Sequence, residues 1–162
     1  MSRLVIPFLL LCLLAPAFAA AQDGLLDWNR VDDPLNEGLG LQVGLSSGIG
    51  LSWKFPLRWW LQAQVTGAIW NDSDDKRHNI GLELQYVLRQ YGRDRLYLAG
   101  GAAYFYHRRA PRTWDHVNVG FGVGLERLRG ERTALQIAAL FTYQGDKETV
   151  LLLPSAGFHY YF

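Results

Sequence analysis

The chain has 162 residues, a formal net charge of +1 and 14% aromatic residues. This length allows one domain at most, and the small net charge provides no general attraction to nucleic acid or to acidic substrates. The only cysteine, Cys12, lies in an N-terminal apolar stretch that export would remove. The remaining chain can therefore form no disulfide and perform no thiol chemistry.

The first 21 residues have the pattern of an export signal. Arg3 provides a positive start, residues 4–14 form an apolar run of the usual length, and a small-x-small cleavage site is offered by residues 17–19 or 19–21. Leu11 precedes Cys12, where a lipoprotein would need a small residue, so acylation is not expected. We predict a signal peptide over residues 1–21.

Residues 22–37 show no sustained alternation and carry four aspartates and Pro34. We expect this segment to be a periplasmic lead-in. Beyond the signal peptide, no apolar run reaches the roughly 18 residues that a membrane helix needs. The chain after residue 37 is therefore either soluble or crosses a membrane as a β-barrel.

From residue 38 to the C terminus, apolar residues alternate with small or polar ones, which is the pattern of a strand with two different faces. The run from Val117 to Leu125 shows this most clearly, because Gly, Asn and Glu fill its alternate positions. The pattern predicts an all-β fold, an antiparallel transmembrane β-barrel of about eight strands over 38–162. The expected strands cover residues 38–46, 49–55, 59–70, 79–89, 95–107, 116–126, 135–143 and 150–162.

The first two of these strands allow two readings. Ser46-Ser47-Gly48 would form the turn of a hairpin, and one long strand over residues 38–55 is the alternative. The other connections sort by length. Those at 56–58, 90–94 and 129–132 are short and should be periplasmic turns, while those at 71–77, 108–115 and 144–148 are longer and should face outward.

The last eight residues resemble the terminal signature of outer-membrane β-barrel proteins. Ser155 supplies the polar position, Gly157 the glycine, and Tyr160 and Phe162 the two aromatic positions. The resemblance implies that the barrel-assembly machinery reads this strand during insertion. Residues 38–162 as a whole resemble the small eight-stranded outer-membrane proteins. This implies a place in the outer membrane of a Gram-negative envelope, in contact with its lipid and lipopolysaccharide.

A soluble β-sandwich is the alternative fold, because its strands alternate in the same way. The aromatic residues favour the membrane barrel, since they fall at the two ends of the expected strands and would form girdles at the membrane interfaces. The periplasmic set is Trp53, Phe55, Trp59, Phe158, Tyr160 and Phe162, and the opposite set is Tyr104, Tyr106, Phe141 and Tyr143.

The interior of an eight-stranded barrel is wide enough only for side chains, so a solute pore is not expected. Polar residues of the inward faces should form a hydrogen-bond and ion-pair network in place of a hydrophobic core. We expect Lys54 and Arg89 to balance Glu83 and Glu126, with His159 in the same network.

No catalytic, metal or cofactor site is expected. Outer-membrane lipid A deacylases carry a His-x-Ser motif, which this sequence lacks. Ser155 and His159 share a face, but four strand residues separate them by ~13 Å, too far for proton transfer. A catalytic triad assembled from residues on different strands is the remaining alternative. The acidic run 72–75 lacks the glycine and the distal glutamate of a calcium loop.

Arg108, Arg109 and Arg112 lie in one expected outer loop beside aromatic residues. Arginine suits bidentate contact with phosphate, so these residues are candidates for binding lipopolysaccharide phosphates, although charged residues at any membrane interface would look alike. We therefore expect a monomeric, non-enzymatic outer-membrane barrel that serves envelope integrity or surface interaction. A lipid A-modifying enzyme and a narrow channel are the alternatives.

Overall fold

The computed structural model of the protein describes residues 36–72, 75–109 and 111–162. The predicted signal peptide and nearly all of the lead-in lie outside these residues. The described part contains eight strands. They are β1 (Gly38–Gly44), β2 (Gly48–Arg58), β3 (Leu61–Asn71), β4 (Asp75–Tyr91), β5 (Asp94–Arg109), β6 (Arg112–Arg129), β7 (Thr133–Gln144) and β8 (Thr149–Tyr161).

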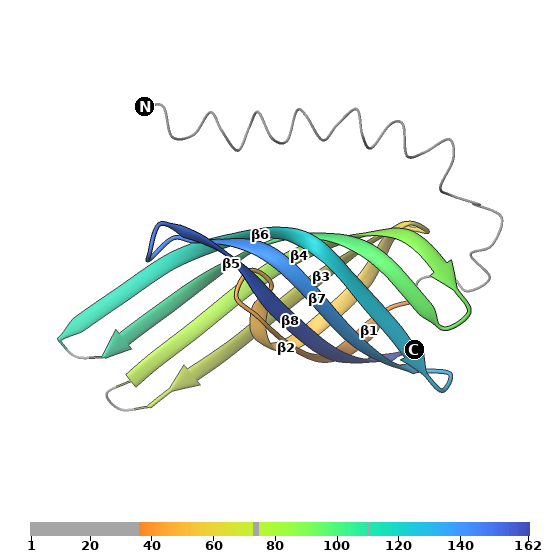
Figure 1. Cartoon of the computed structure of the whole chain (residues 1–162). Helices are drawn as coiled ribbons and strands as arrows, with labels where there is room; N and C mark the ends of the chain where they lie inside the picture. The colour runs from red at the N-terminus through yellow and green to blue at the C-terminus, as the bar shows by residue number, and fades with distance from the viewer. Residues whose placement is uncertain (1–35, 73–74, 110) are drawn as a thin grey trace. The chain divides into compact units, whose positions relative to one another are not determined.

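Each strand pairs antiparallel with the next, and β8 pairs with β1 to close the sheet into a barrel (Figure 1). The prediction of an antiparallel barrel of about eight strands is therefore confirmed. At one end the strands are joined by tight turns at 59–60, 92–93 and 130–132. Gly92 and Gly130 have positive φ there, a conformation that glycine adopts without steric cost.

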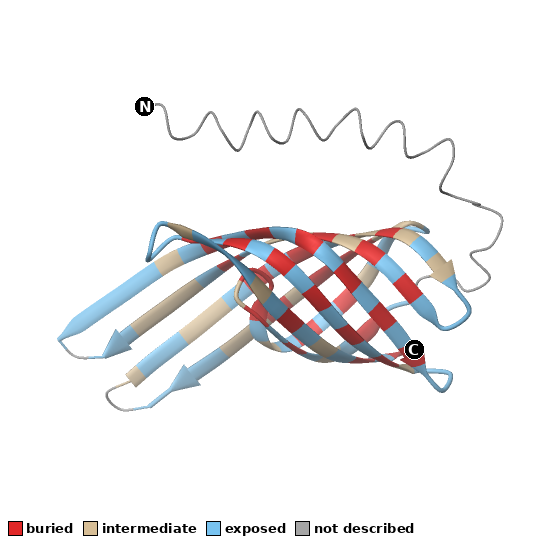
Figure 2. Cartoon of the chain, viewed as in Figure 1, coloured by how far each residue is buried: buried red, intermediate tan, exposed pale blue. Residues whose placement is uncertain are grey.

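The barrel wall alternates between buried and exposed residues along most of its strands, most regularly in β6 and β7 (Figure 2). Among the described residues, 18 buried side chains are polar or charged and only ten are hydrophobic. Most of the large hydrophobic side chains are exposed instead. The core of this protein is thus a polar interior enclosed by an apolar wall.

The predicted hairpin at the start of the barrel is present, and the alternative of one long strand is wrong. The turn consists of Leu45, Ser46 and Ser47, one residue earlier than expected, because Gly44 pairs with Gly48. Both serines are buried. This connection, which we call the inner turn, does not project from the rim.

The inner turn occupies the barrel interior. Asn118 on β6 donates a hydrogen bond to the carbonyl of Leu45 at 3.1 Å, and Thr142 on β7 donates to Ser46 at 3.4 Å. Glycines on the facing strands leave room for it, since a Cβ on Gly81 or Gly120 would overlap Ser47 or Ser46. The sequence indicated none of this, because it shows only that the connection is short.

Three strands are much longer than the rest. β4, β5 and β6 have 17, 16 and 18 residues, against seven in β1. Residues 68–71, 75–79, 105–109 and 112–116 continue the sheet past the last pairs with β2 and β7, which are at Gly67 and Asn118. We call these four segments the extension, which runs to the lower left in Figure 1.

The extension corrects the prediction for two of the outer loops. Residues 71–77 and 108–115 were expected to be loops, but most of them belong to β3, β4, β5 and β6. The reason is physical. Neither face of the extension is apolar throughout, so the alternation that marks a strand in the barrel wall is absent there.

We predict that Gly81→Ala lowers the free energy of unfolding by about 1–3 kcal/mol, the usual cost of overpacking an interior. The added methyl group would overlap the carbonyl group of Ser47, which is backbone and cannot rotate away. Gly100→Ala is the control, because a Cβ there makes only an ordinary contact with Phe121 at 3.7 Å. Equal urea unfolding midpoints for the two variants would contradict the packing of the inner turn.

Candidate functional site

Glu126 is the centre of an ion-pair network inside the barrel. Its carboxylate pairs with Lys54 of β2 and with Arg95 of β5, the latter at 3.0 Å. Tyr161 of β8 donates a third hydrogen bond at 2.8 Å. All four side chains are buried. The predicted placement of Lys54 and Glu126 in the interior is therefore correct, and the network joins four strands.

The prediction for Arg89 is wrong, because this residue is exposed. The pairing of β4 with β5 shifts register between Val87 and Arg89. Such a bulge inserts one extra residue, so side chains beyond it change faces. Arg95 supplies the second cation instead, and it also donates to Gln90 at 3.1 Å. The alternation gave a usable signal for Arg95, which has the same parity as the inward-facing Tyr97.

Glu83 lies inside the barrel as predicted, but in a separate group of amides. Its carboxylate accepts hydrogen bonds from Gln85 at 2.7 Å and from Gln136 at 3.5 Å. Gln85 also donates to Gln64 at 2.9 Å. The two buried carboxylates thus differ in their partners. Glu126 pairs with a lysine and an arginine, whereas Glu83 accepts hydrogen bonds from neutral amides.

His159 is buried, and its Nε2 lies 3.1 Å from the hydroxyl of Ser52 on β2. A histidine beside a serine is part of a catalytic triad only when a third group orients the ring. Among the described residues, Nδ1 of His159 has no hydrogen-bond partner. Ser155 is buried on the same strand and is not the serine that His159 contacts. The pair therefore lacks the acid of a triad.

The terminal signature lies at the seam where β8 meets β1. Ser155 and Gly157 face the interior, and a Cβ on Gly157 would overlap the amide of Gln42. Tyr160 and Phe162 are exposed on the outer surface. The amide of Phe162 donates to the carbonyl of Glu37 at 3.1 Å, so the last residue still pairs across the seam.

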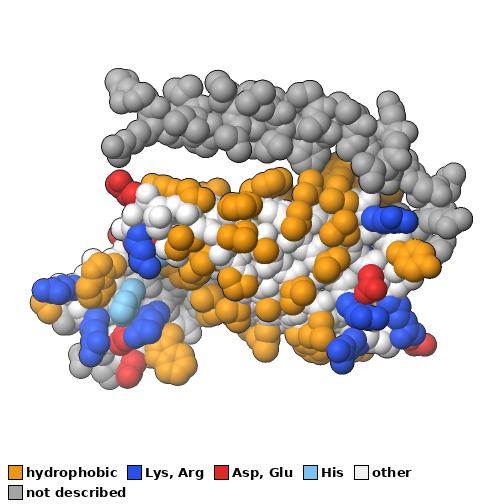
Figure 3. Space-filling view, in the orientation of Figure 1, with side chains coloured by type: hydrophobic (Ala, Val, Ile, Leu, Met, Phe, Trp, Pro, Cys, Tyr) orange, Lys and Arg blue, Asp and Glu red, His pale blue; other side chains and the backbone are white. Residues whose placement is uncertain are grey.

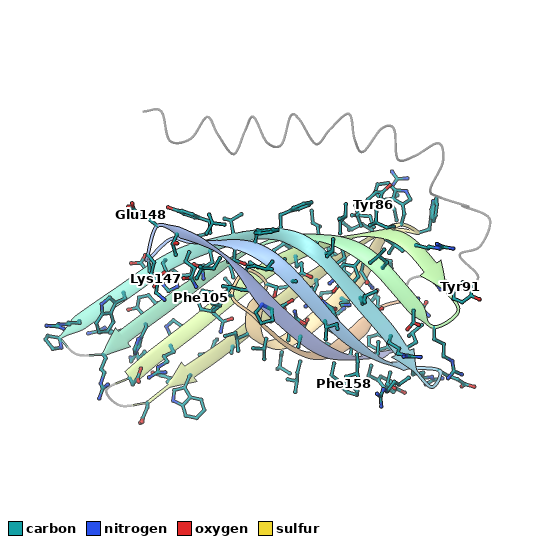
Figure 4. The ribbon with its side chains drawn as sticks, viewed as in Figure 1. Tyr86, Tyr91, Phe105, Lys147, Glu148 and Phe158 are labelled. Atoms are coloured by element: carbon teal, nitrogen blue, oxygen red, sulfur yellow. The ribbon has the colours of Figure 1, made fainter. Side chains whose placement is uncertain are left out.

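The inward face of the extension carries a second group of candidate side chains. Trp70, Arg77, His107 and Trp114 are successive cross-strand partners on β3, β4, β5 and β6. They form one row across the sheet. The next row toward the barrel contains Phe105, which Figure 4 shows at the same end as Lys147 and Glu148 of the β7–β8 connection.

Polar and ring contacts hold these side chains. Arg77 donates to both carboxylate oxygens of Asp75, at 3.0 and 2.5 Å, and His107 pairs with the same carboxylate at 2.9 Å. The rings of His107 and Trp114 lie 5.2 Å apart, centre to centre. A surface hollow of about 430 Å³ is lined by Trp70, Asp75 and Arg77.

The three arginines proposed from the sequence do not share one face. Arg109 and Arg112 are cross-strand partners on the inward face of the extension. Arg108 pairs with Thr113 on the opposite, outward face. All three are exposed. A single ligand on one face of the sheet can therefore contact Arg109 and Arg112 but not Arg108.

Comparisons with known proteins found no match to a protein-family model, a curated protein or a solved structure. Within residues 36–72, 75–109 and 111–162, no helix is long and apolar enough to cross a membrane. The same residues contain no group of three His, Cys, Asp or Glu side chains arranged to hold a metal ion.

We predict that Arg95→Met lowers the free energy of unfolding by about 2–4 kcal/mol, because Glu126 loses a buried cationic donor. Arg89→Met is the matched control, and we expect a change within about 0.5 kcal/mol for this exposed residue. Urea unfolding followed by tryptophan fluorescence measures both. The reverse order of the two effects would show that Arg89, not Arg95, belongs to the interior.

Proposed function

We propose that this protein is an integral outer-membrane β-barrel, a non-enzymatic and closed anchor that presents its extension at the cell surface to interact with lipopolysaccharide. The observation that supports the proposal most is the apolar outer wall. Leu51, Ile137 and Phe141 are 73, 62 and 63% exposed, and similar side chains cover every strand. In water so large an apolar surface would drive aggregation, whereas lipid would cover it.

The distribution of charge along the barrel also favours this proposal. In Figure 3 hydrophobic side chains cover the middle of the visible face, and charged side chains gather toward its two ends. Arg89, Asp94 and Arg127 lie near the tight turns, and Asp75 and Arg108 lie on the extension. An apolar band between two polar ends is the arrangement of a barrel that spans a bilayer.

The two ends of the barrel differ in a way that supports an orientation. The tight turns at 59–60, 92–93 and 130–132 are all at one end, which in outer-membrane barrels is the periplasmic end. The extension is at the other end. We therefore propose that the extension lies outside the cell.

The filled interior favours an anchor over the two alternatives. The Glu126 network, the amides around Glu83 and the inner turn occupy the space that a channel would need. A lipid A-modifying enzyme would need an accessible nucleophile and base, but Ser52 and His159 are buried.

We predict that Val123→Arg lowers the free energy of unfolding in phospholipid vesicles by about 2–4 kcal/mol, the cost of an arginine at the middle of the membrane. Val123 is an exposed residue in the middle of β6. Thr113→Arg is the matched control, on the same strand and the same outward face but in the extension. It should change stability by no more than about 0.5 kcal/mol.

Equal effects of these two arginines would contradict the membrane proposal, because an exposed valine in water tolerates arginine as well as threonine does. Urea unfolding followed by tryptophan fluorescence is the measurement for both variants.

We predict that deletion of Phe162 impairs assembly in the outer membrane, because the terminal aromatic residue is the end of the proposed insertion signal. Heat-modifiable migration of membrane fractions on gels measures the folded form. Phe162→Tyr keeps an aromatic ring at this position and should assemble normally. If the deletion variant assembles as well as the unchanged protein, the signature does not direct insertion in this chain.

A further inference from the structure

Within the part of the chain that the structure describes, no strand covers the inward face of the extension, because the strands on the other side of the barrel end before they reach it. β6 pairs with β7 no further out than Asn118, and β3 pairs with β2 no further out than Gly67. The inner turn is withdrawn into the interior. Among the described strands, none lies opposite the row from Trp70 to Trp114, so this row faces the space beyond the outer ends of β2 and β7.

The side chains on this face combine aromatic rings with hydrogen-bonding groups. Trp70 and Trp114 are 68 and 46% exposed. Arg77 lies between them in the row, and Asp75, which accepts its hydrogen bonds, lies in the next row outward. The rings of Phe105 and His116 are stacked, with centres 5.4 Å apart. Sugars have apolar C–H faces and a rim of hydroxyl groups, so they fit flat aromatic rings that stand beside fixed donors and acceptors.

The outermost row of the same face adds positive charge. Arg109 and Arg112 are directly opposite each other on β5 and β6. Like charges in this position destabilise a sheet, because opposite Cβ atoms are only about 5 Å apart. Asp75 is the other cross-strand neighbour of Arg109, but its oxygens bond Arg77 and His107. An anion between the two guanidinium groups would remove their repulsion.

We propose that the inward face of the extension binds a phosphorylated saccharide, with sugar rings on Trp70 and Trp114 and a phosphate between Arg109 and Arg112. The source we assign is the sugar core of lipopolysaccharide, because these sugars stand at the height of the low rim when the barrel is in the outer membrane. This assignment rests on the proposed function and names the part of lipopolysaccharide that is recognised. Bidentate arginine contacts with phosphate supply the specificity.

Arg109→Gln and Arg108→Gln form a matched pair for testing this proposal. They are neighbours on one strand, both exposed, and each substitution removes one positive charge, but only Arg109 is on the inward face. The probe is the phosphorylated core oligosaccharide released from lipid A, titrated calorimetrically into the purified protein in detergent micelles. We expect Arg109→Gln to weaken binding about tenfold, the loss of a charge-assisted hydrogen bond, and Arg108→Gln to leave it unchanged.

Equal weakening by the two substitutions would show non-specific charge attraction and would overturn the proposal. Trp114→Ala against Tyr106→Ala makes the same comparison for an aromatic ring, since Tyr106 lies on the outward face, stacked on His78. Only Trp114→Ala should weaken binding, and equal effects would again overturn the proposal.

Two further probes separate sugar from phosphate. The dephosphorylated oligosaccharide should bind more weakly than the phosphorylated one, and inorganic phosphate should bind more weakly still. If inorganic phosphate binds as tightly as the oligosaccharide, the site is an anion site without sugar recognition, and the proposal fails. These titrations do not depend on the cellular location of the protein. Their failure would leave the comparison of Val123→Arg with Thr113→Arg intact.

Discussion

The contacts of Glu126 constrain the arrangement of the strands around the interior. Its carboxylate is bonded by Lys54, Arg95 and Tyr161, which come from three other strands. Removing one partner of a buried ion pair is strongly destabilising, because the other charge then lacks compensation. These bonds therefore constrain how β2, β5, β6 and β8 face one another. A shift of one strand by a single residue would move its inward side chains to the outer wall and break the network.

The narrow interior is related to the unequal heights of the strands at the end that carries the extension. An eight-stranded barrel encloses little more than its own side chains, so the inner turn can enter only where glycines leave space. Gly81, Gly101 and Gly120 provide that space on β4, β5 and β6. These are also the strands that continue into the extension. The same strands thus accept the turn in the interior and present an open face above it, and the withdrawn turn leaves that face uncovered.

The sequence was sufficient for the barrel but not for the face above it. Alternation predicts the eight strands and the inward positions of Lys54, Glu83 and Glu126, because period two is a local property that needs no knowledge of partners. Arg89 was misplaced because a bulge breaks the period, and nothing local marks it. The row from Trp70 to Trp114 could not be predicted, since its four residues come from four strands and only the register of three strand pairs brings them into line.

The energetics of the extension favour a binding role over a purely structural one. Cross-strand pairs such as Phe105 with His116 stabilise it, and the bonds of Asp75 to Arg77 and His107 add to this. The juxtaposition of Arg109 and Arg112 acts in the opposite direction, because two like charges face each other at the last pair of β5 and β6. A segment selected for stability alone would favour opposite charges at these positions. An anion bound between Arg109 and Arg112 would offset this repulsion, and the sheet beneath them is already folded to receive one.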